Sequence, residues 1–120
     1  MARVVVLRRQ RDFDCLFESG QRYYNKLLVT VVRRRPESNQ VRVAFIVGTK
    51  VDKRAVVRNR IKRRLREAWR REVPQLSVGA DIAFVASSAS AQASYWDLSE
   101  VMKAHLAQAG LDCRQPHRTD

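Results

Sequence analysis

Residues 54–72 read RAVVRNRIKRRLREAWRRE, a run of helical length with positive charge on three sides. On a helix of about 3.6 residues per turn, the apolar side chains gather in a narrow stripe along the fourth side. The stripe contains Val57, Ile61, Leu65 and Ala68, with Trp69 at its edge. The pattern predicts a helix that packs on a protein core through this stripe and turns its charged sides toward a polyanion.

The charge of this segment is not balanced within it. Only Glu67 and Glu72 are acidic, so opposite charges one turn apart cannot support the helix as they do on an ordinary solvated helix. The whole chain has a formal net charge of +12, and its Lys and Arg are concentrated in the first 72 residues. This distribution is typical of nucleic-acid-binding proteins. Membrane binding is the alternative, but an interfacial helix would carry a broad apolar face.

The length of 120 residues suffices for one core without disulfides or structural metal. We expect a single domain over residues 1–110 and a flexible tail over residues 111–120. Cys15 and Cys113 are the only cysteines and lack the spacing of a metal site. The apolar run at residues 4–7 is too short for a signal peptide, and no stretch approaches a membrane span. We therefore expect a cytoplasmic protein with no membrane partner.

Helical and strand-like patterns alternate along the chain. Phe13, Leu16 and Phe17 share one face of a predicted helix over residues 8–19, and Gly20 stands where a C-terminal cap is expected. The remaining predicted elements are strands over residues 24–32 and 41–47, the basic helix, a strand over residues 80–86, a loop over residues 87–93 and a last helix over residues 94–109. This order predicts an α+β fold of the type αββαβα.

The last helix has clear signals at both ends. Ser94 and Asp97 have the spacing of a capping box at its start, and Gly110 follows its last apolar residue. We assign Trp96, like Trp69, to the core.

The sequence does not supply a catalytic constellation. The only histidines are His105, on an apolar helix face where a place at the edge of the core is expected, and His117, in the tail. The motifs of metalloproteases, serine hydrolases and nucleotide-binding loops are absent. Asp14 and Glu18 lie one turn apart and could hold a hard cation, but a solvated helix face is the preferred interpretation. The chain is predicted to perform no chemistry itself.

Residues suited to binding give stronger signals. Asn59 offers a donor and an acceptor between the guanidinium groups of Arg58 and Arg60, a combination that suits structured RNA. The alternative is that Asn59 is an ordinary surface residue. Phe13 and Phe17 also have two interpretations, a core contact or a platform on which single-stranded bases stack. Helical spacing favours the core first, and the neighbouring arginines favour the platform.

Three segments resemble one protein family. RAVVRNRIKRRLRE, residues 54–67, is similar to the pattern A-x-x-R-N-R-x-K-R-x-x-R-E of the bacterial ribonuclease P protein subunit. RRQRDFDCLFESG, residues 8–20, resembles the first helix of that family, and VRVAFIVGTK, residues 41–50, matches its following strand less closely. Ala44, where the family usually has Gly, and Thr49, where a Lys is common, depart from the pattern.

The resemblance implies a fold and a function. The fold is a two-layer α+β sandwich like the second domain of a small-subunit ribosomal protein, with a left-handed βαβ crossover that the general rule of handedness does not predict. The function is that of the small protein subunit of the ribonucleoprotein that removes the 5′ leader from precursor tRNA. The RNA subunit is then the catalyst and uses Mg²⁺, so this chain would belong to an endonuclease without contributing a catalytic residue or binding a metal. The expected partners are ribonuclease P RNA and precursor tRNA, with no obligate protein partner.

The resemblance also implies two binding sites. One set of residues, in and just before the basic helix, would bind the RNA subunit: Arg54, Arg58, Asn59, Arg60, Lys62, Arg63 and Arg66. The other set, in a cleft between the first helix and the sheet, would hold the single-stranded leader: Phe13, Phe17, Arg42 and Lys50.

Two other functions share some of these features. A ribosomal or other structural RNA-binding protein would have the same basic composition, and co-purification with ribosomal subunits would distinguish it. A DNA-binding regulator would need a recognition helix paired with a supporting helix across a short turn, and no such helix pair is predicted before the basic helix.

Overall fold

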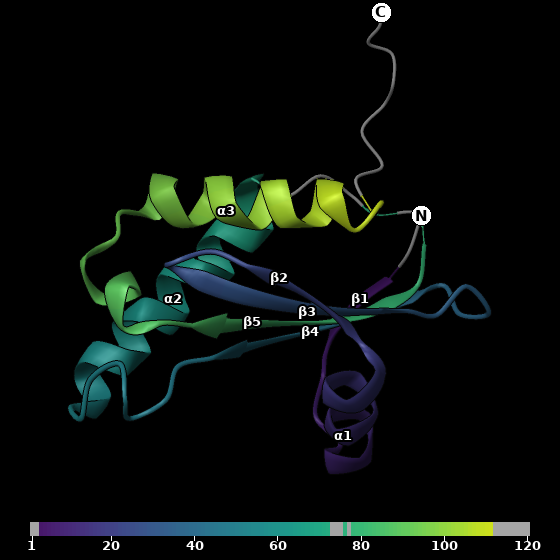
Figure 1. Ribbon diagram of the computed structural model, residues 1–120, viewed down its shortest axis with the longest axis horizontal. Coiled ribbons are helices and arrows are strands. Elements are labelled where there is room, and N and C mark those ends of the chain that lie inside the picture. The colour runs from purple at the N-terminus through teal and green to yellow at the C-terminus, as the bar shows by residue number, and fades with distance from the viewer. Residues whose placement is uncertain (1–2, 73–75, 77, 112–120) are drawn as a thin grey trace, which may run out of the picture.

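One mixed sheet organises the fold, with two α-helices on one face and one on the other (Figure 1). The computed structural model describes residues 3–72, 76 and 78–111. The elements are, in chain order, β1 (Arg3–Val6), α1 (Gln10–Ser19), β2 (Gln21–Tyr24), β3 (Leu28–Arg34), β4 (Gln40–Ile46), α2 (Ala55–Glu72), β5 (Ala80–Ala86), the 3-10 helix η1 (Ser88–Gln92) and α3 (Tyr95–Gln108). The predicted α+β class is confirmed.

The five strands lie in the order β1-β4-β5-β3-β2. β4 runs parallel to both of its neighbours, β1 and β5, whereas β3 pairs antiparallel with β5 and with β2. Because β4 and β5 are adjacent and parallel, α2 is the crossover of a βαβ unit. The crossover places the basic helix on the same face of the sheet as α3, which it contacts.

Side chains alternate between two cores, one on each face of the sheet. On β3, Leu28 and Val32 face α2 and α3, whereas Val31 faces α1. The larger core is closed by the apolar stripe of α2, whose four predicted residues are all buried, and by apolar side chains of α3. The smaller core, under α1, contains Leu7, Leu16, Val31, Ala44 and Ala83, with Phe13 and Phe17 packed against it.

Local signals fix the ends of α3 and α1. The Ser94 hydroxyl accepts a hydrogen bond from the backbone N–H of Asp97 (3.0 Å), and the Asp97 carboxylate accepts one from the N–H of Ser94 (3.2 Å), so the predicted capping box is confirmed. Gly110 follows α3 with a φ of +74°, which favours glycine. Gly20 ends α1 with an extended backbone instead. Glycine is required there because a Cβ would lie 2.5 Å from the carbonyl oxygen of Leu16.

Several details of the predicted elements are wrong. β1 is missing from the prediction because four residues give too short a pattern. The predicted strand over residues 24–32 contains only the end of β2 and most of β3, because the side-chain oxygen of Asn25 accepts from the N–H of Leu27 (2.9 Å) and turns the chain between them. η1 occupies the predicted loop at residues 87–93. Leu111, assigned to the tail, is buried in the core, and the rest of the tail lies outside the described residues.

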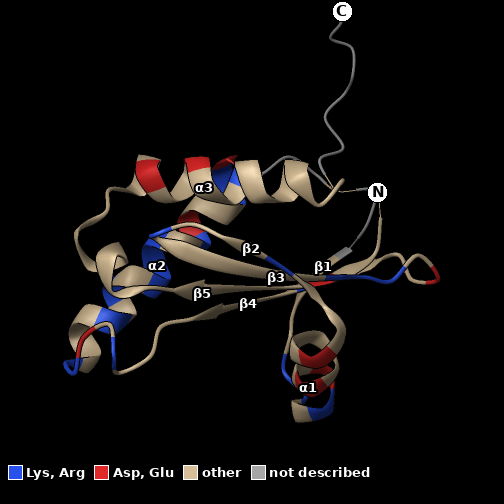
Figure 2. Ribbon diagram, in the orientation of Figure 1, with Lys and Arg blue, Asp and Glu red and all other residues tan. Residues whose placement is uncertain are grey.

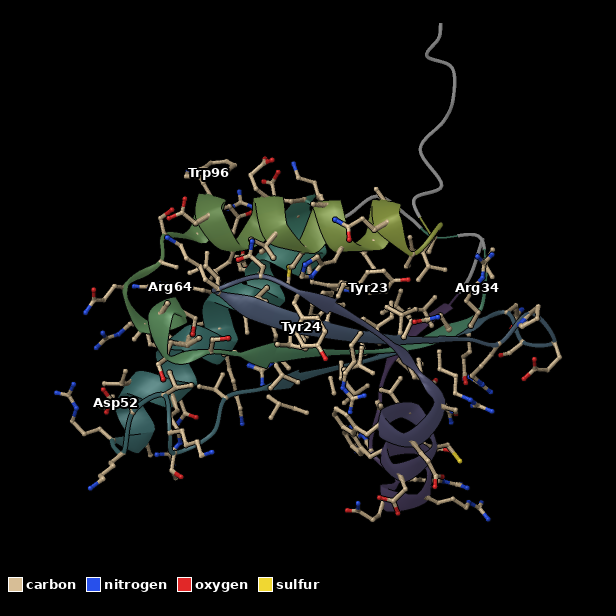
Figure 3. The ribbon with its side chains drawn as sticks, viewed as in Figure 1. Tyr23, Tyr24, Arg34, Asp52, Arg64 and Trp96 are labelled. Carbon is tan, nitrogen blue, oxygen red and sulfur yellow. The ribbon has the colours of Figure 1, made fainter. Side chains whose placement is uncertain are left out.

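Trp96 is exposed, contrary to its predicted place in the core. It is 63% exposed on the side of α3 that points away from the sheet (Figure 3). α3 meets the sheet through the face that carries Leu98, and a residue two positions earlier falls on the opposite side of a helix. Trp69 is half-buried and packs against Phe45 and Phe84, as predicted.

Candidate nucleic-acid interface

The outer side of α2 carries cations without protein partners. Figure 2 shows Lys and Arg along this helix, with few acidic residues among them. Asn59, Arg60, Arg63 and Arg66 are exposed, and Lys62 is half-buried. Within the described part of the chain, the ion pairs and side-chain hydrogen bonds of α2 are made by other residues. The charges of these four cations are therefore available to an external anion.

Arg54 and Arg58 are bound to the loop between β4 and α2. The Arg54 guanidinium donates to both carboxylate oxygens of Asp52, each at 3.1 Å, and these hydrogen bonds lower the pKa of Asp52 to about 2. Arg58 Nη1 donates to the backbone carbonyls of Asp52 (3.1 Å) and Lys53 (2.7 Å). Of the predicted RNA-binding residues, these two also shape the start of the helix.

The aromatic pair of α1 lies at the edge of the smaller core. The rings of Phe13 and Phe17 are nearly parallel, with centroids 6.3 Å apart, and both residues are half-buried. The guanidinium of Arg22 lies 5.8 Å from the Phe17 centroid, a cation–π distance. The predicted core contact is confirmed for both residues, and their partial exposure leaves the stacking platform as a prediction.

Arg42 is held between α1 and the sheet by two carboxylates. Its Nε and Nη2 donate to the two oxygens of Asp81 (2.7 and 2.8 Å), and its Nη1 donates to Asp12 of α1 (2.8 Å). Asp81 is fully buried and also lies 3.4 Å from Nη1 of Arg35. The hydrogen bond with Asp81 is the main cause that raises the pKa of Arg42. Most of the hydrogen-bonding capacity of Arg42 is therefore used within the protein.

The face of the sheet under α1 continues toward the loop after β4. Tyr24 pairs with Val29 in the β2–β3 register, so it shares the face of α1, and it is 72% exposed. Figure 3 shows it on this side of the sheet, with Tyr23 on the other. Lys50 is exposed in the loop after β4, and this loop lies at the opposite end of the sheet from α1 (Figure 1). The sequence prediction missed Tyr24. Successive side chains of a strand point to opposite faces, so Tyr24 must lie on the face of α1 when Tyr23 packs against the larger core.

Other titratable groups have structural surroundings. His105 is buried, and its Nδ1 lies 2.7 Å from the hydroxyl of Thr30, which places it in the core as expected. Cys15 is a half-buried free thiol. In residues 3–72, 76 and 78–111, no group of three or more His, Cys, Asp or Glu could hold a metal ion, and no helix has the length and apolar character to cross a membrane. Cys113 and His117 lie outside these residues.

A sandwich that presents unpaired arginines on one helix and half-open aromatic rings on another defines a nucleic-acid-binding protein. The family model described as Ribonuclease P matches residues 1–110. The chain belongs to this family, that of the protein component of ribonuclease P. The protein of this family works with ribonuclease P RNA in a tRNA-processing ribonuclease.

Individual relatives agree with this assignment. The chain is 33% identical over 103 residues to the ribonuclease P protein component of a Pseudanabaena strain, covering 86% of this chain and 89% of that one. The solved ribonuclease P protein of Thermotoga maritima matches with a TM-score of 0.72 at 26% identity, covering 87% and 96% of the two chains. A ribonuclease P protein mutant of Staphylococcus aureus has the same fold, with a TM-score of 0.76 at 23% identity over 88% and 87% of the chains.

Proposed function

We propose that this chain holds the two RNAs of ribonuclease P on two different surfaces. α2 binds the RNA subunit, and the face under α1 binds the 5′ leader of precursor tRNA. The observation that carries the proposal is that the unpaired cations of α2 and the half-open aromatic rings of α1 lie on opposite sides of the sheet. Unpaired cations lie on α2, whereas half-open aromatic rings lie on the face of the sheet that α2 does not cover.

The proposed contact of α2 is with phosphates. Arg60, Arg63 and Arg66 present guanidinium groups that fit phosphate oxygens in pairs, and Lys62 adds a further charge. Asn59 adds a donor and an acceptor that can reach a 2′-hydroxyl or a base edge. Arg54 and Arg58 join this surface from its loop end, and they keep the loop in place when RNA is absent.

The proposed leader site combines stacking with charge. Single strands are bound by aromatic rings that stack on bases and by cations that follow the backbone. Phe13 and Phe17 supply rings, Tyr24 extends them along the face, and Lys50 supplies a cation at its far end. Arg42 lies at the base of α1, where its remaining exposed surface borders this face.

The chemistry of leader removal is assigned to the RNA. Mg²⁺ bound at the RNA active site supplies the metal ion for phosphodiester hydrolysis, and the described side chains of this protein bind and orient RNA. Because precursor tRNA is made in the bacterial cytoplasm, the proposal places the chain there.

Reconstitution tests the proposal. The chain is added to ribonuclease P RNA, and cleavage of precursor tRNA is measured at low Mg²⁺, where a protein that binds RNA and leader should raise the rate. Phe17→Ala should weaken binding of precursor tRNA to the reconstituted enzyme by about 1 to 3 kcal/mol. Binding of mature tRNA, which has no leader, should stay unchanged.

The matched variant Phe17→Leu keeps apolar bulk against the core and removes the aromatic ring. It should lose the preference for precursor tRNA while melting close to the parent. Equal losses for both tRNAs would remove Phe17 from the leader site. No stimulation of the RNA subunit at all would leave a structural RNA-binding role.

A further inference from the structure

An open pocket lies where α2 meets the start of α3. Its volume is about 320 Å³, and it is lined by Arg60, Arg63, Arg64, Glu67 and Tyr95. Arg64 is fixed there by a hydrogen bond from its Nη1 to the backbone carbonyl of Ala93 (3.1 Å). Arg64 is not among the residues predicted to bind RNA, and nothing in the proposed function uses Tyr95.

The pocket has an excess of positive charge. Glu67 is its only acid, and the Glu67 carboxylate already accepts from Arg70 (2.6 Å) and lies 3.8 Å from Arg71. The three arginines of the pocket therefore keep their charge for another anion. Arg60 lies about one helical turn from Arg63 and Arg64, which are adjacent in sequence. The three guanidinium groups therefore line the same opening.

An exposed aromatic platform borders this pocket. The rings of Tyr95 and Trp96 meet edge to face, with centroids 4.9 Å apart and an interplanar angle of 87°. The Tyr95 hydroxyl donates to Glu72 (2.9 Å), which fixes its ring, and Trp96 projects from the outer side of α3 (Figure 3). A tryptophan that is 63% exposed leaves a large apolar area in water, and Trp and Tyr are enriched at binding interfaces.

We propose that Trp96 and the arginine pocket receive one unpaired nucleotide of ribonuclease P RNA. The base stacks on the Trp96 indole, and its phosphates bind Arg60, Arg63 and Arg64. A paired RNA helix would use the arginines alone, because its bases are already stacked inside the duplex. The exposed indole, which contacts Tyr95 of the pocket, therefore selects a looped-out or single-stranded base. This inference rests on the proposed role of α2 in binding the RNA subunit.

The test uses the intrinsic fluorescence of the full chain. The protein has two tryptophans, and Trp69 is packed between Phe45 and Phe84, so the exposed Trp96 dominates any change at the surface. Titration with ribonuclease P RNA should quench the emission of the parent and should leave the emission of Trp96→Phe nearly unchanged.

Affinity provides the second readout. Trp96→Ala should weaken binding of ribonuclease P RNA by roughly tenfold, about 1.4 kcal/mol, and Trp96→Phe should retain most of it because a ring remains to stack. Val6→Ala, which trims an exposed apolar residue on β1, is the matched control and should bind like the parent.

The outcomes separate this inference from the proposed function. Parent-like affinity for Trp96→Ala, together with unquenched Trp96 on bound protein, would overturn the nucleotide site and leave α2 as the RNA-binding helix. Quenching that depends on protein concentration without RNA would assign Trp96 to contact between copies and would also overturn it. A parent that does not bind ribonuclease P RNA would overturn both.

Discussion

The buried carboxylate of Asp81 is expected to hold Arg42 and α1 in place on the proposed leader site, and Asp81→Asn tests this. The substitution keeps the shape of the side chain and removes its charge. Arg42 then loses its bidentate partner, and Arg35 loses a carboxylate 3.4 Å away. Asp12 alone remains to pair with Arg42.

The magnitude follows from the burial of the pair. Asp81 is fully buried and the Arg42 side chain is 18% exposed, so little water can replace the lost interaction. Removing one partner of a buried pair costs about 3 to 5 kcal/mol, against about 1 kcal/mol or less for a surface pair. Because Asp12 still pairs with Arg42, we expect the lower end, about 3 kcal/mol. For a domain of this size, that loss corresponds to a fall in Tm of roughly 10 °C.

The assay is thermal and urea unfolding of the single variant and of Asp81→Leu combined with Arg42→Met. Replacing both charges by apolar groups of similar size is often neutral, so the double variant should recover most of the lost stability. If Arg42 contributes to the leader site, the double variant should still bind precursor tRNA more weakly. A loss below about 1 kcal/mol for Asp81→Asn would show that the pair behaves like a surface ion pair and would refute the reasoning.

Three further predictions concern α2 and the larger core. Affinity for ribonuclease P RNA should fall roughly a hundredfold or more between about 50 and 200 mM salt, because four or more cations displace counterions; a flat response in a salt titration would contradict phosphate binding. Arg60→Ala should weaken RNA binding without changing Tm. Arg58→Ala should weaken RNA binding and also lower stability by about 1 kcal/mol, because the backbone carbonyls of the loop before α2 lose their hydrogen bonds. Melting and binding curves of both variants will show whether they differ in this way. Burial lowers the pKa of His105, so its imidazole takes up a proton at a lower pH in the folded chain than in the unfolded chain, where the ordinary pKa is about 6.5. Stability should therefore fall as pH drops below about 6.5, and His105→Gln should show a smaller slope when stability is measured against pH in this range.

The parts of the fold that could be predicted from sequence depend on local patterns. The stripe of α2 and the capping box at Ser94 are set by residues within one or two turns, so periodicity and spacing suffice to find them. The division of β2 from β3 depends on a turn at Asn25, whose side chain accepts from Leu27 and whose backbone N–H donates to the carbonyl of Leu28, inside a run that otherwise reads as continuous strand. β1 is defined by its parallel pairing with β4, which no local pattern records.

In the candidate site too, local patterns could be predicted from the sequence and contacts between distant segments could not. The cations of α2 lie outside the apolar stripe and could be predicted to be exposed from helix geometry alone. The surroundings of Arg42 could not be predicted, because Asp12 and Asp81 reach it from a helix and a strand that are distant in sequence. Residue type predicts burial for Trp96, and this prediction is wrong because the orientation of α3 on the sheet decides which side of the helix is open.

The strand order also sets when this protein can fold during its synthesis. β5 occupies the centre of the sheet, where Ala86 pairs with Leu28 and Ala80 with Val41, so the central partner of two earlier strands is made late. Until β5 emerges from the ribosome, the apolar stripe of α2 has no completed sheet to cover, and we expect the most basic part of the chain to remain unfolded. Contacts this distant in sequence slow folding, because a long loop must close before any pairing is gained. A nascent chain stopped before Ala80 should therefore expose its arginine-rich segment as a flexible polycation, able to bind RNA without specificity.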